Sequence, residues 1–342
     1  MNESFLKETK RACVVYHGSH IDWKYKKIIE GLDIDYKPIS GLDIFRTILF
    51  QSNCPKLTHL HLRYLINYGY TATVVFYISL IFLAKLKGLK VVWTCHNIYE
   101  HNTWPKRFND FIRTLIVLLS DEIVVFHPSL IKYLGNARRA NLHAACFGDY
   151  KEYLELPMHG TNECFRRHYS DWCNSQNIQY PDVVFIGDYK EAKNINLLMD
   201  LAEVDKSINI LIVARGIPSQ KKNPNLFTFG SSFVYRELVD VFNAGPCIGY
   251  VGHDNLSIAT SIYLYSSFGL PMIFIDADPY LDIVKMYDCG SIFSDSSGSL
   301  RSAYYKVRHE YDRKRKGAMN LISDNTWAKS ALIHRKIFSY DS

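Results

Sequence analysis

The chain alternates between short apolar runs that stop abruptly at polar residues and longer segments in which apolar positions have helical spacing. The clearest run covers residues 91–94, and two imidazoles, a carboxylate and two amides follow it within residues 95–102. Other strand-like runs lie at 12–16, 57–62, 121–126, 182–187, 208–213, 246–250 and 272–275, and helical patterns at 22–30, 71–84, 108–119, 194–204 and 327–338. The pattern predicts parallel strands joined by helices, the α/β class.

The simplest architecture is two doubly wound, Rossmann-like domains that face one another across a cleft. The alternation lapses over residues 147–181, which are richer in Gly, Pro, Asn and charge and are interpreted as a linker. We therefore expect an acceptor-side domain at 1–165, a nucleotide-sugar-binding domain at 166–325, and a C-terminal helix at 326–342 that packs back on the first domain. In such sheets ligands bind beyond the carboxyl ends of the strands, so polar residues that follow a strand are site candidates.

Length and cysteine usage narrow the class of protein. With 342 residues, 48% of them apolar, the chain can bury the cores of two domains. Its eight cysteines include no CxxC pair, which argues against a disulfide framework or a zinc ribbon and indicates reduced thiols. The first thirty residues contain no apolar signal core, so we expect a cytoplasmic protein.

Charge is uneven along the chain. Residues 1–171 hold 22 Lys/Arg against 16 Asp/Glu, whereas residues 172–342 hold 18 of each. The surplus suits an anionic partner, such as a membrane surface or a phospholipid-linked substrate, although a solvated basic surface explains it equally. Nucleic acid is disfavoured because the basic residues form no dense cluster interleaved with aromatics. The apolar segment 71–84 is too short to span a bilayer and predicts a helix packed on the sheet, or else an interfacial membrane helix.

Candidate anion-binding groups lie in the second half. Lys190 and Lys193 follow the strand that ends at Gly187 and precede a helix that begins near Asn194, an arrangement that suits a diphosphate. Hydroxyls at 257–261 precede another helix and either hold phosphate oxygens or simply cap that helix.

Candidate sugar-contacting groups lie in the first half. A glycine turn after the first strand carries His17 and His20, and it is either a ligand contact or only a tight connection. His59 and His61 share one face of a strand, and we expect one near the ligand crevice and the other in the core.

Several motifs together resemble a known family. They are HLHL at 59–62, WTCHNIYEH at 93–101, FGDYKEYLE at 147–155, FIGDYKEAKN at 185–194, TSIYLYSSFGLP at 260–271 and a late helix that contains Trp327. The series resembles the GT-B glycosyltransferases of bacterial polysaccharide assembly, most of all the xanthan β-mannosyltransferase family. Members of that family are inverting enzymes that use GDP-mannose and a lipid-diphosphate-linked acceptor.

The resemblance carries over residue by residue, with departures. The family pattern HLHWPE corresponds to residues 59–64, where this chain lacks the Trp and the Glu. The pattern HNxxPHE corresponds to residues 96–102, where this chain keeps His96 and His101 but has Asn102 in place of the Glu. RPYKG is residues 190–194, with Lys190 replacing the arginine and Lys193 retained, and NSGT is residues 258–261, with Thr260 and Ser261 as the hydroxyls. The paired glutamates of many retaining enzymes are replaced by Leu256 and Leu264, which favours inversion.

The resulting hypothesis is transfer of a hexose from GDP-mannose or a UDP-sugar to a glycan or lipid-linked acceptor. Donor-binding candidates are Lys190, Lys193, Gly187, Thr260 and Ser261; acceptor-binding candidates are His20, His61 and His101. Glu100 or Asp22 is the expected base, ahead of His20 and His96, and His96 is the expected sugar contact. No metal is required if lysines and helix dipoles stabilise the diphosphate. A GT-B-type nucleotide-sugar epimerase and a non-catalytic polysaccharide- or membrane-binding protein remain alternatives.

Overall fold

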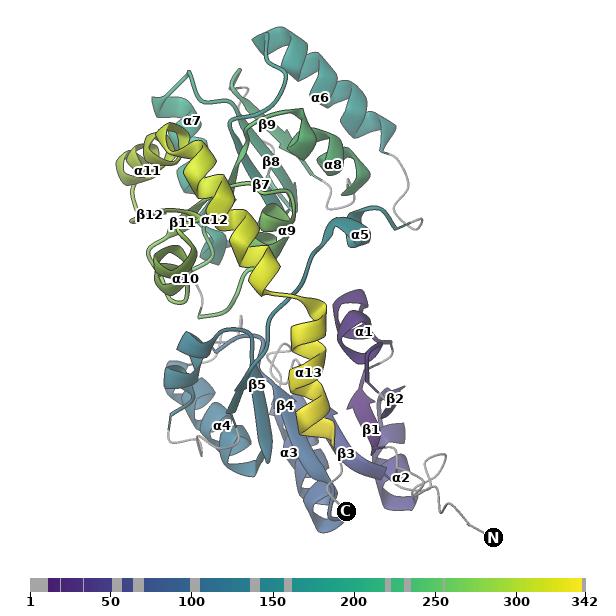
Figure 1. Ribbon diagram of the computed structural model, residues 1–342. Coiled ribbons are helices and arrows are strands. Elements are labelled where there is room, and N and C mark those ends of the chain that lie inside the picture. The colour runs from purple at the N-terminus through teal and green to yellow at the C-terminus, as the bar shows by residue number, and fades with distance from the viewer. Residues whose placement is uncertain are drawn as a thin grey trace. The chain divides into compact units, whose positions relative to one another are not determined.

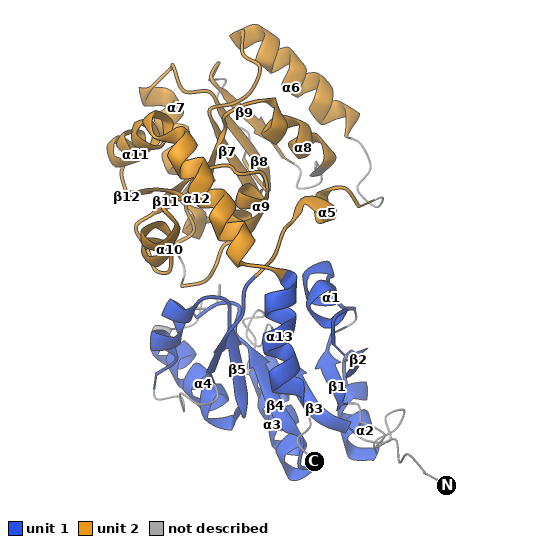
Figure 2. Cartoon of the chain, viewed as in Figure 1, with its two compact units in different colours: residues 1–146, 327–342 blue, residues 147–326 orange. Residues whose placement is uncertain are grey.

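A computed structural model of the chain divides it into two compact units. It describes residues 12–18, 20–32, 34–50, 57–63, 71–98, 105–135, 142–156, 162–218, 223–230, 235–254 and 256–339 (Figure 1). Unit 1 comprises residues 1–146 and 327–342, and unit 2 comprises residues 147–326 (Figure 2).

The core of unit 1 is a parallel sheet. Its strands are β1 (Ala12–His17), β2 (Ile34–Ile39), β3 (Leu57–Leu62), β4 (Lys90–Thr94), β5 (Glu122–Val125) and β6 (Leu142–Ala144), in the spatial order β2-β1-β3-β4-β5-β6. The inner strands are largely buried on both faces because helices cover both faces of a parallel sheet. The order reverses between β1 and β3, so this pair is the topological switch point, where a ligand crevice is expected.

Helices cover both faces of this sheet. They are α1 (Trp23–Ile29), α2 (Asp43–Phe50), α3 (Thr71–Leu86), α4 (Lys106–Leu119) and α13 (Trp327–Phe338), and a short 3₁₀ helix, η1 (Pro128–Leu134), follows β5. Right-handed crossovers place α1 on one face and α2, α3 and α4 on the other. In agreement, α3 packs against α2 and α4, and α1 packs against α13 (Figure 1). Trp23 and Trp327 meet edge to face at 5.4 Å, so the C-terminal helix completes unit 1.

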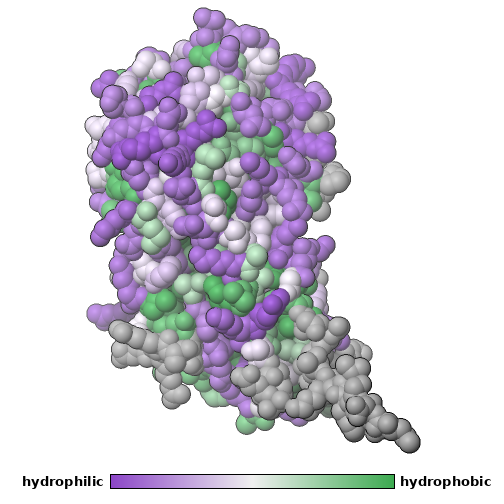
Figure 3. Space-filling model, viewed as in Figure 1, coloured by the Kyte–Doolittle hydropathy of each residue, from purple (hydrophilic) through white to green (hydrophobic). Residues whose placement is uncertain are grey.

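Unit 2 repeats this plan. Its strands are β7 (Val183–Asp188), β8 (Ile210–Arg215), β9 (Leu226–Phe229), β10 (Ile248–Val251), β11 (Met272–Ile275) and β12 (Gly290–Phe293), all parallel and in the order β12-β11-β10-β7-β8-β9. Its helices are α5 (Lys151–Leu154), α6 (Glu163–Gln176), α7 (Ile195–Val204), α8 (Tyr235–Ala244), α9 (Ser261–Ser267), α10 (Tyr280–Tyr287), α11 (Ser297–His309) and α12 (Tyr311–Asp324), with the 3₁₀ turn η3 (Glu191–Lys193). Here the switch point lies between β7 and β10. Hydrophilic residues prevail on the face of this unit that Figure 3 shows.

The structure confirms the α/β class with two doubly wound parallel sheets, but not the linker expected at 147–181. Within that segment, α6 packs on the edge strand β9 through Phe165 and Trp172, whose rings lie 5.1 Å from Phe229 and 5.5 Å from Phe227. The helix leaves little apolar periodicity in the sequence because its few apolar positions are spread among polar residues. The units accordingly divide after Cys146, earlier than the boundary expected at residue 165.

Two further expectations can be compared with the structure. Segment 71–84 does form a helix, α3, and among the described residues no helix is long and apolar enough to cross a membrane. Cys95, Cys146, Cys164, Cys173, Cys247 and Cys289 are free thiols as expected. Cys13 differs from that expectation because it is disulfide-bonded.

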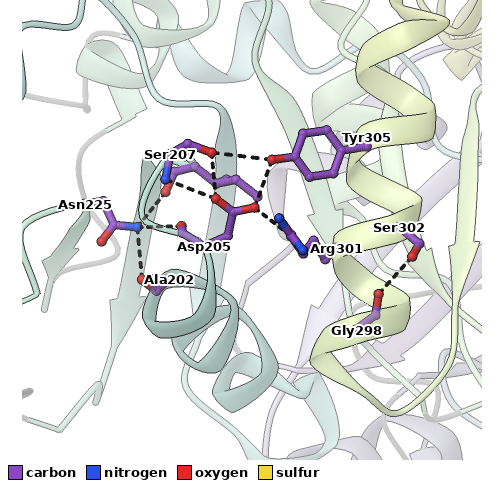
Figure 4. Close-up of polar contacts among 9 residues, drawn as sticks. Ala202, Asp205, Ser207, Asn225, Gly298, Arg301, Ser302 and Tyr305 are labelled. Carbon is purple, nitrogen blue, oxygen red and sulfur yellow. Dashed lines mark hydrogen bonds and ion pairs between the residues drawn. The ribbon is translucent and has the colours of Figure 1, made fainter.

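A buried carboxylate ties α7 to α11 at the amino end of β8. Asp205 is 6% exposed, and its carboxylate accepts hydrogen bonds from Arg301 Nε at 2.7 Å, the Tyr305 hydroxyl at 2.9 Å and the Ser207 hydroxyl at 2.6 Å (Figure 4). These bonds, that from Ser207 above all, lower the pKa of Asp205 because they stabilise its charged form.

Replacing Asp205 by asparagine is expected to lower the unfolding free energy at pH 7 by about 2–3 kcal/mol, because charge-assisted hydrogen bonds are lost. A depressed pKa means that the carboxylate stabilises the fold above its unfolded pKa of about 4, and that this contribution is lost as pH falls below that value. Calorimetric unfolding of both proteins between pH 5 and pH 3 should therefore show the difference shrinking. The control is D240N, whose carboxylate is 76% exposed and which should unfold like the wild type. A difference that is as large at pH 3 as at pH 5 contradicts the assignment.

Candidate functional site

The carboxyl end of β7 holds a partly buried ammonium group directly over a glycine. Gly187 has φ of +150°, and the Nζ atom of Lys193 lies 2.9 Å from the point that a Cβ at residue 187 would occupy. Any side chain at this position would meet the lysine. The glycine therefore gives Lys193 its place at the strand end, beside the switch point between β7 and β10.

The loop that carries Lys193 is bound to the loop after β10. Asn194 has the left-handed backbone conformation, and its Nδ2 donates to the carbonyl of Gly252 at 2.9 Å and to the carboxylate of Asp254 at 3.2 Å. The Tyr250 hydroxyl donates to the carbonyl of Asn194 at 2.7 Å. These bonds join residues nearly sixty positions apart and hold the end of η3 against the neighbouring strand.

The charge at this edge is mainly positive. Burial lowers the pKa of Lys193, and the neighbouring Asp188 opposes that shift while Lys190 and Arg215 add to it. Arg215 also pairs with Asp188 at 2.9 Å, and Lys190 is exposed. Three cations therefore lie at this edge together with the carboxylates of Asp188 and Asp254, and Arg215 is paired with Asp188. The two lysines are the groups suited to attract a doubly charged anion.

Helix α7 begins directly behind these cations. The side chain of the N-cap residue Asn194 does not cap the first turn. The Leu197 N–H donates to the Asn194 carbonyl at 3.1 Å, and the N–H groups before it are those that a ligand would meet. A ten-residue helix whose uncapped N-terminus lies beside two lysines has the components that bind a diphosphate.

The hydroxyls before α9 lie at the same edge of the sheet. Thr260 and Ser261 are half-buried, and the Thr260 hydroxyl makes no capping hydrogen bond to the helix. Ser257, the other proposed cap, is hydrogen-bonded to His253 Nε2 at 2.8 Å. The capping role allowed for Thr260 is therefore absent, and its hydroxyl remains a candidate for holding a ligand oxygen.

Unit 1 contains a cavity of about 830 Å³ at its own switch point. The ends of β1 and β2, the residue after β3 and the first turns of α3 all contribute to its lining. The lining residues are Tyr16, His17, Gly18, His20, Asp22, Ser40, Gly41, Arg63, Ala72, Thr73, Phe76 and Tyr77. This volume lies within the range of small-molecule sites, about 300–1,000 Å³.

An ion pair forms one wall of the cavity. Asp22 accepts a hydrogen bond from the Tyr25 backbone N–H at 3.0 Å, which caps α1, and another from Arg63 at 2.6 Å. The Arg63 guanidinium stacks 4.2 Å above the Tyr25 ring, and its side chain is 2% exposed. Asp22 is thus both a helix cap and a cavity wall, since 35% of its side chain remains exposed.

A second polar pair lies across β1 and α3. His17 Nδ1 is hydrogen-bonded to the Tyr77 hydroxyl at 2.9 Å, and burial lowers the pKa of His17, so its ring is neutral at pH 7. The exposed His20 lines the same cavity. His17 and His20 both belong to the glycine turn considered above, whereas Arg63 and Tyr77 were not among the predicted site residues, although Arg63 directly follows β3.

The structure argues against an acceptor contact by His61. Its ring is fully buried and hydrogen-bonded to the hydroxyls of Tyr36 at 2.6 Å and Thr94 at 2.8 Å, and burial holds its pKa well below the usual range. His59 is also fully buried, so both histidines of β3 belong to the core. Alternation placed them on one face correctly, but helix α13 covers that face: the Phe338 ring lies 5.5 Å from His59 and 5.6 Å from His61.

His96 follows β4 and lies near the ion pair. Its ring packs 5.1 Å from Phe126, and its pKa is well below the usual range because of burial and the nearby charges of Arg63 and Lys24. A neutral imidazole can donate or accept a hydrogen bond to a sugar hydroxyl. Glu100 and His101 lie outside the described residues. Within the part of the chain that the structure describes, no group of three or more His, Cys, Asp or Glu is placed to hold a metal ion.

Comparison with known proteins relates the chain to solved structures only. No protein-family model and no curated protein matches the sequence. Anabaena HepE in complex with UDP has 10% identity and a TM-score of 0.62, covering 96% of this chain and 100% of its own. Sucrose-phosphate synthase from Thermosynechococcus elongatus has 12% identity and a TM-score of 0.65, and the match covers 96% of this chain and 98% of the synthase. TarM has 12% identity and a TM-score of 0.61, and the match covers 87% of this chain and 58% of TarM. The chain therefore has the GT-B fold of glycosyltransferases.

Proposed function

We propose that the protein is a glycosyltransferase that moves a hexose from a nucleotide-diphosphate sugar to a glycan or lipid-linked saccharide, with inversion. The observation that carries this proposal is the Lys193 ammonium over Gly187 beside the uncapped start of α7. The GT-B fold supports it, because structures with this fold include HepE in complex with UDP and with UDP-glucose.

In this proposal the donor diphosphate is held by Lys190, Lys193 and the first N–H groups of α7. Gly187 leaves room for the lysine, and Thr260 and Ser261 hold phosphate oxygens without adding charge. The HepE complexes favour a UDP-sugar, whereas the resemblance to the xanthan β-mannosyltransferase family favours GDP-mannose. No metal is required, because the cations and the helix dipole neutralise the leaving group.

The acceptor saccharide occupies the cavity of unit 1. Phe76 and Tyr77 offer apolar surface to a sugar ring, while Asp22, Arg63 and His20 offer hydrogen-bonding groups to its hydroxyls. We assign His96 to a sugar contact as well. The protein would act in the cytoplasm, as a peripheral protein on the cytoplasmic face of a membrane when its acceptor is lipid-linked.

Inverting transfer needs one proton acceptor. The acceptor oxygen attacks the anomeric carbon from the face opposite the diphosphate and loses its proton to Asp22 or Glu100, while the bond from that carbon to the diphosphate oxygen breaks. Two of the roughly four lone-pair positions of the Asp22 carboxylate are already used by Tyr25 and Arg63, which leaves two for an acceptor hydroxyl.

Calorimetric titration with UDP, GDP and their sugars tests the proposal and identifies whether the donor carries uracil or guanine. We expect one nucleotide to bind, and its sugar to turn over only when a saccharide acceptor is added. Donor turnover without any acceptor would indicate the epimerase instead. The absence of nucleotide affinity would indicate a non-catalytic polysaccharide- or membrane-binding protein and would overturn the proposal.

A further inference from the structure

Helix α3 is apolar on its outer face as well as its inner one. Its sixteen residues include one charged side chain, Lys85, and its outward stripe contains Val75, Phe82 and Leu86, which are 58%, 51% and 85% exposed. A helix that is apolar all round is normally buried in a core or in a membrane. This helix packs on the sheet with one face and leaves the other uncovered.

The two neighbouring helices extend this apolar surface. Leu49 and Phe50 of α2 are 42% and 76% exposed, and Phe111 and Leu118 of α4 are 61% and 71% exposed. Because α3 packs against both helices on one face of the sheet, the three stripes lie side by side. We call this surface the α2–α4 layer. It carries eight of the fifteen large apolar side chains that are exposed among the described residues.

The same layer has a net positive charge. Residues 42–50, 71–90 and 105–121 hold seven Lys/Arg against three Asp, a surplus of four out of +6 for the whole chain. Lys87, Lys90 and Arg107 are exposed. Basic side chains around an apolar helical face are what an anionic lipid surface binds, since headgroups attract the cations while the apolar stripe enters the acyl boundary.

We propose that the α2–α4 layer docks this protein on an anionic phospholipid membrane, with α3 lying along the surface. The proposal goes beyond sugar transfer and does not depend on it. One consequence rests on the proposed function: Ala72 of the same outward stripe also lines the cavity of unit 1, so a lipid-linked acceptor would reach the cavity from the docked surface.

Flotation of the full chain with vesicles tests the proposal without any sugar. We expect binding to phosphatidylcholine vesicles that contain phosphatidylglycerol and much weaker binding to pure phosphatidylcholine. The variant V75E/F82E should lose at least about 30-fold in partitioning, because two apolar contacts are replaced by carboxylates. The variant K87Q/K90Q should lose about 25-fold on anionic vesicles only.

A matched control is L281E/M286E on α10 of unit 2, whose side chains are 44% and 65% exposed and which should bind vesicles like the wild type. Unchanged thermal unfolding of every variant shows that the fold is intact. Wild-type protein that ignores both vesicle types, or V75E/F82E that binds as the wild type does, overturns the proposal. The proposal is also overturned if the wild type self-associates and V75E/F82E does not, because the layer is then an interface between two copies of the chain.

Discussion

Replacing Lys193 by methionine is expected to lower kcat/KM for the nucleotide sugar by about 100- to 1,000-fold, the cost of removing one preorganised charge-stabilising group. The ammonium is partly buried over Gly187, where its attraction to a diphosphate is screened less than in water. Methionine preserves the volume and packing of the side chain, so the fold should remain intact. Steady-state kinetics and nucleotide titration measure the loss.

The neighbouring Lys190 is the comparison because its side chain is exposed. The variant K190M should lose only about tenfold or less, as expected for a charge close to solvent. Because burial lowers the pKa of Lys193, its charge is lost at a lower pH than that of an ordinary lysine. Nucleotide affinity of the wild type should thus fall as pH rises into the alkaline range, and K193M should lack that decline. Wild-type kinetics in K193M would refute the donor site.

Replacing Asp22 by asparagine should reduce kcat by about 10²–10⁴-fold if this carboxylate removes the acceptor proton. Asparagine is as good a helix cap as aspartate, so α1 should keep its first turn. The change removes a base and leaves the shape of the cavity unaltered. The exposed D35N, on β2 and outside the cavity, is the control and should turn over normally.

Two comparisons separate a base from a structural anion at this position. The variant D22N leaves the buried Arg63 without its carboxylate, a loss that costs about 3–5 kcal/mol in comparable buried pairs. The double variant D22N/R63M removes both charges and should recover stability without recovering turnover. E100Q should be measured in parallel. If D22N and E100Q both keep near-normal turnover with an intact fold, neither residue is the base.

Local features of the chain made part of the donor site predictable. Gly187, Lys190 and Lys193 lie within seven residues of each other, so a strand that ends in a short turn before a helix brings them together whatever the rest of the chain does. Tyr250 and Asp254 support the same loop but were not selected, because they are nearly sixty residues away and become neighbours only when β10 pairs with β7.

The cavity of unit 1 shows the limit of local reasoning more clearly. Asp22 and Arg63 are forty-one residues apart, and their contact depends on β3 pairing with β1. Phe76 and Tyr77 belong to a helix whose apolar sequence predicts only packing on the sheet, yet both residues line the cavity. The error at His61 has the same origin, since the helix that covers it is α13, more than 260 residues further along the chain.

By itself, the sequence determined the α/β class, the two parallel sheets and the strand ends at which polar groups stand, because burial on both faces of a strand leaves a local apolar signature. Only the tertiary structure decided which strand ends are neighbours, which histidines are core, and which helix face stays uncovered. Those outcomes depend on strand order and on contacts between distant segments, and no window of the sequence contains both partners of such a contact.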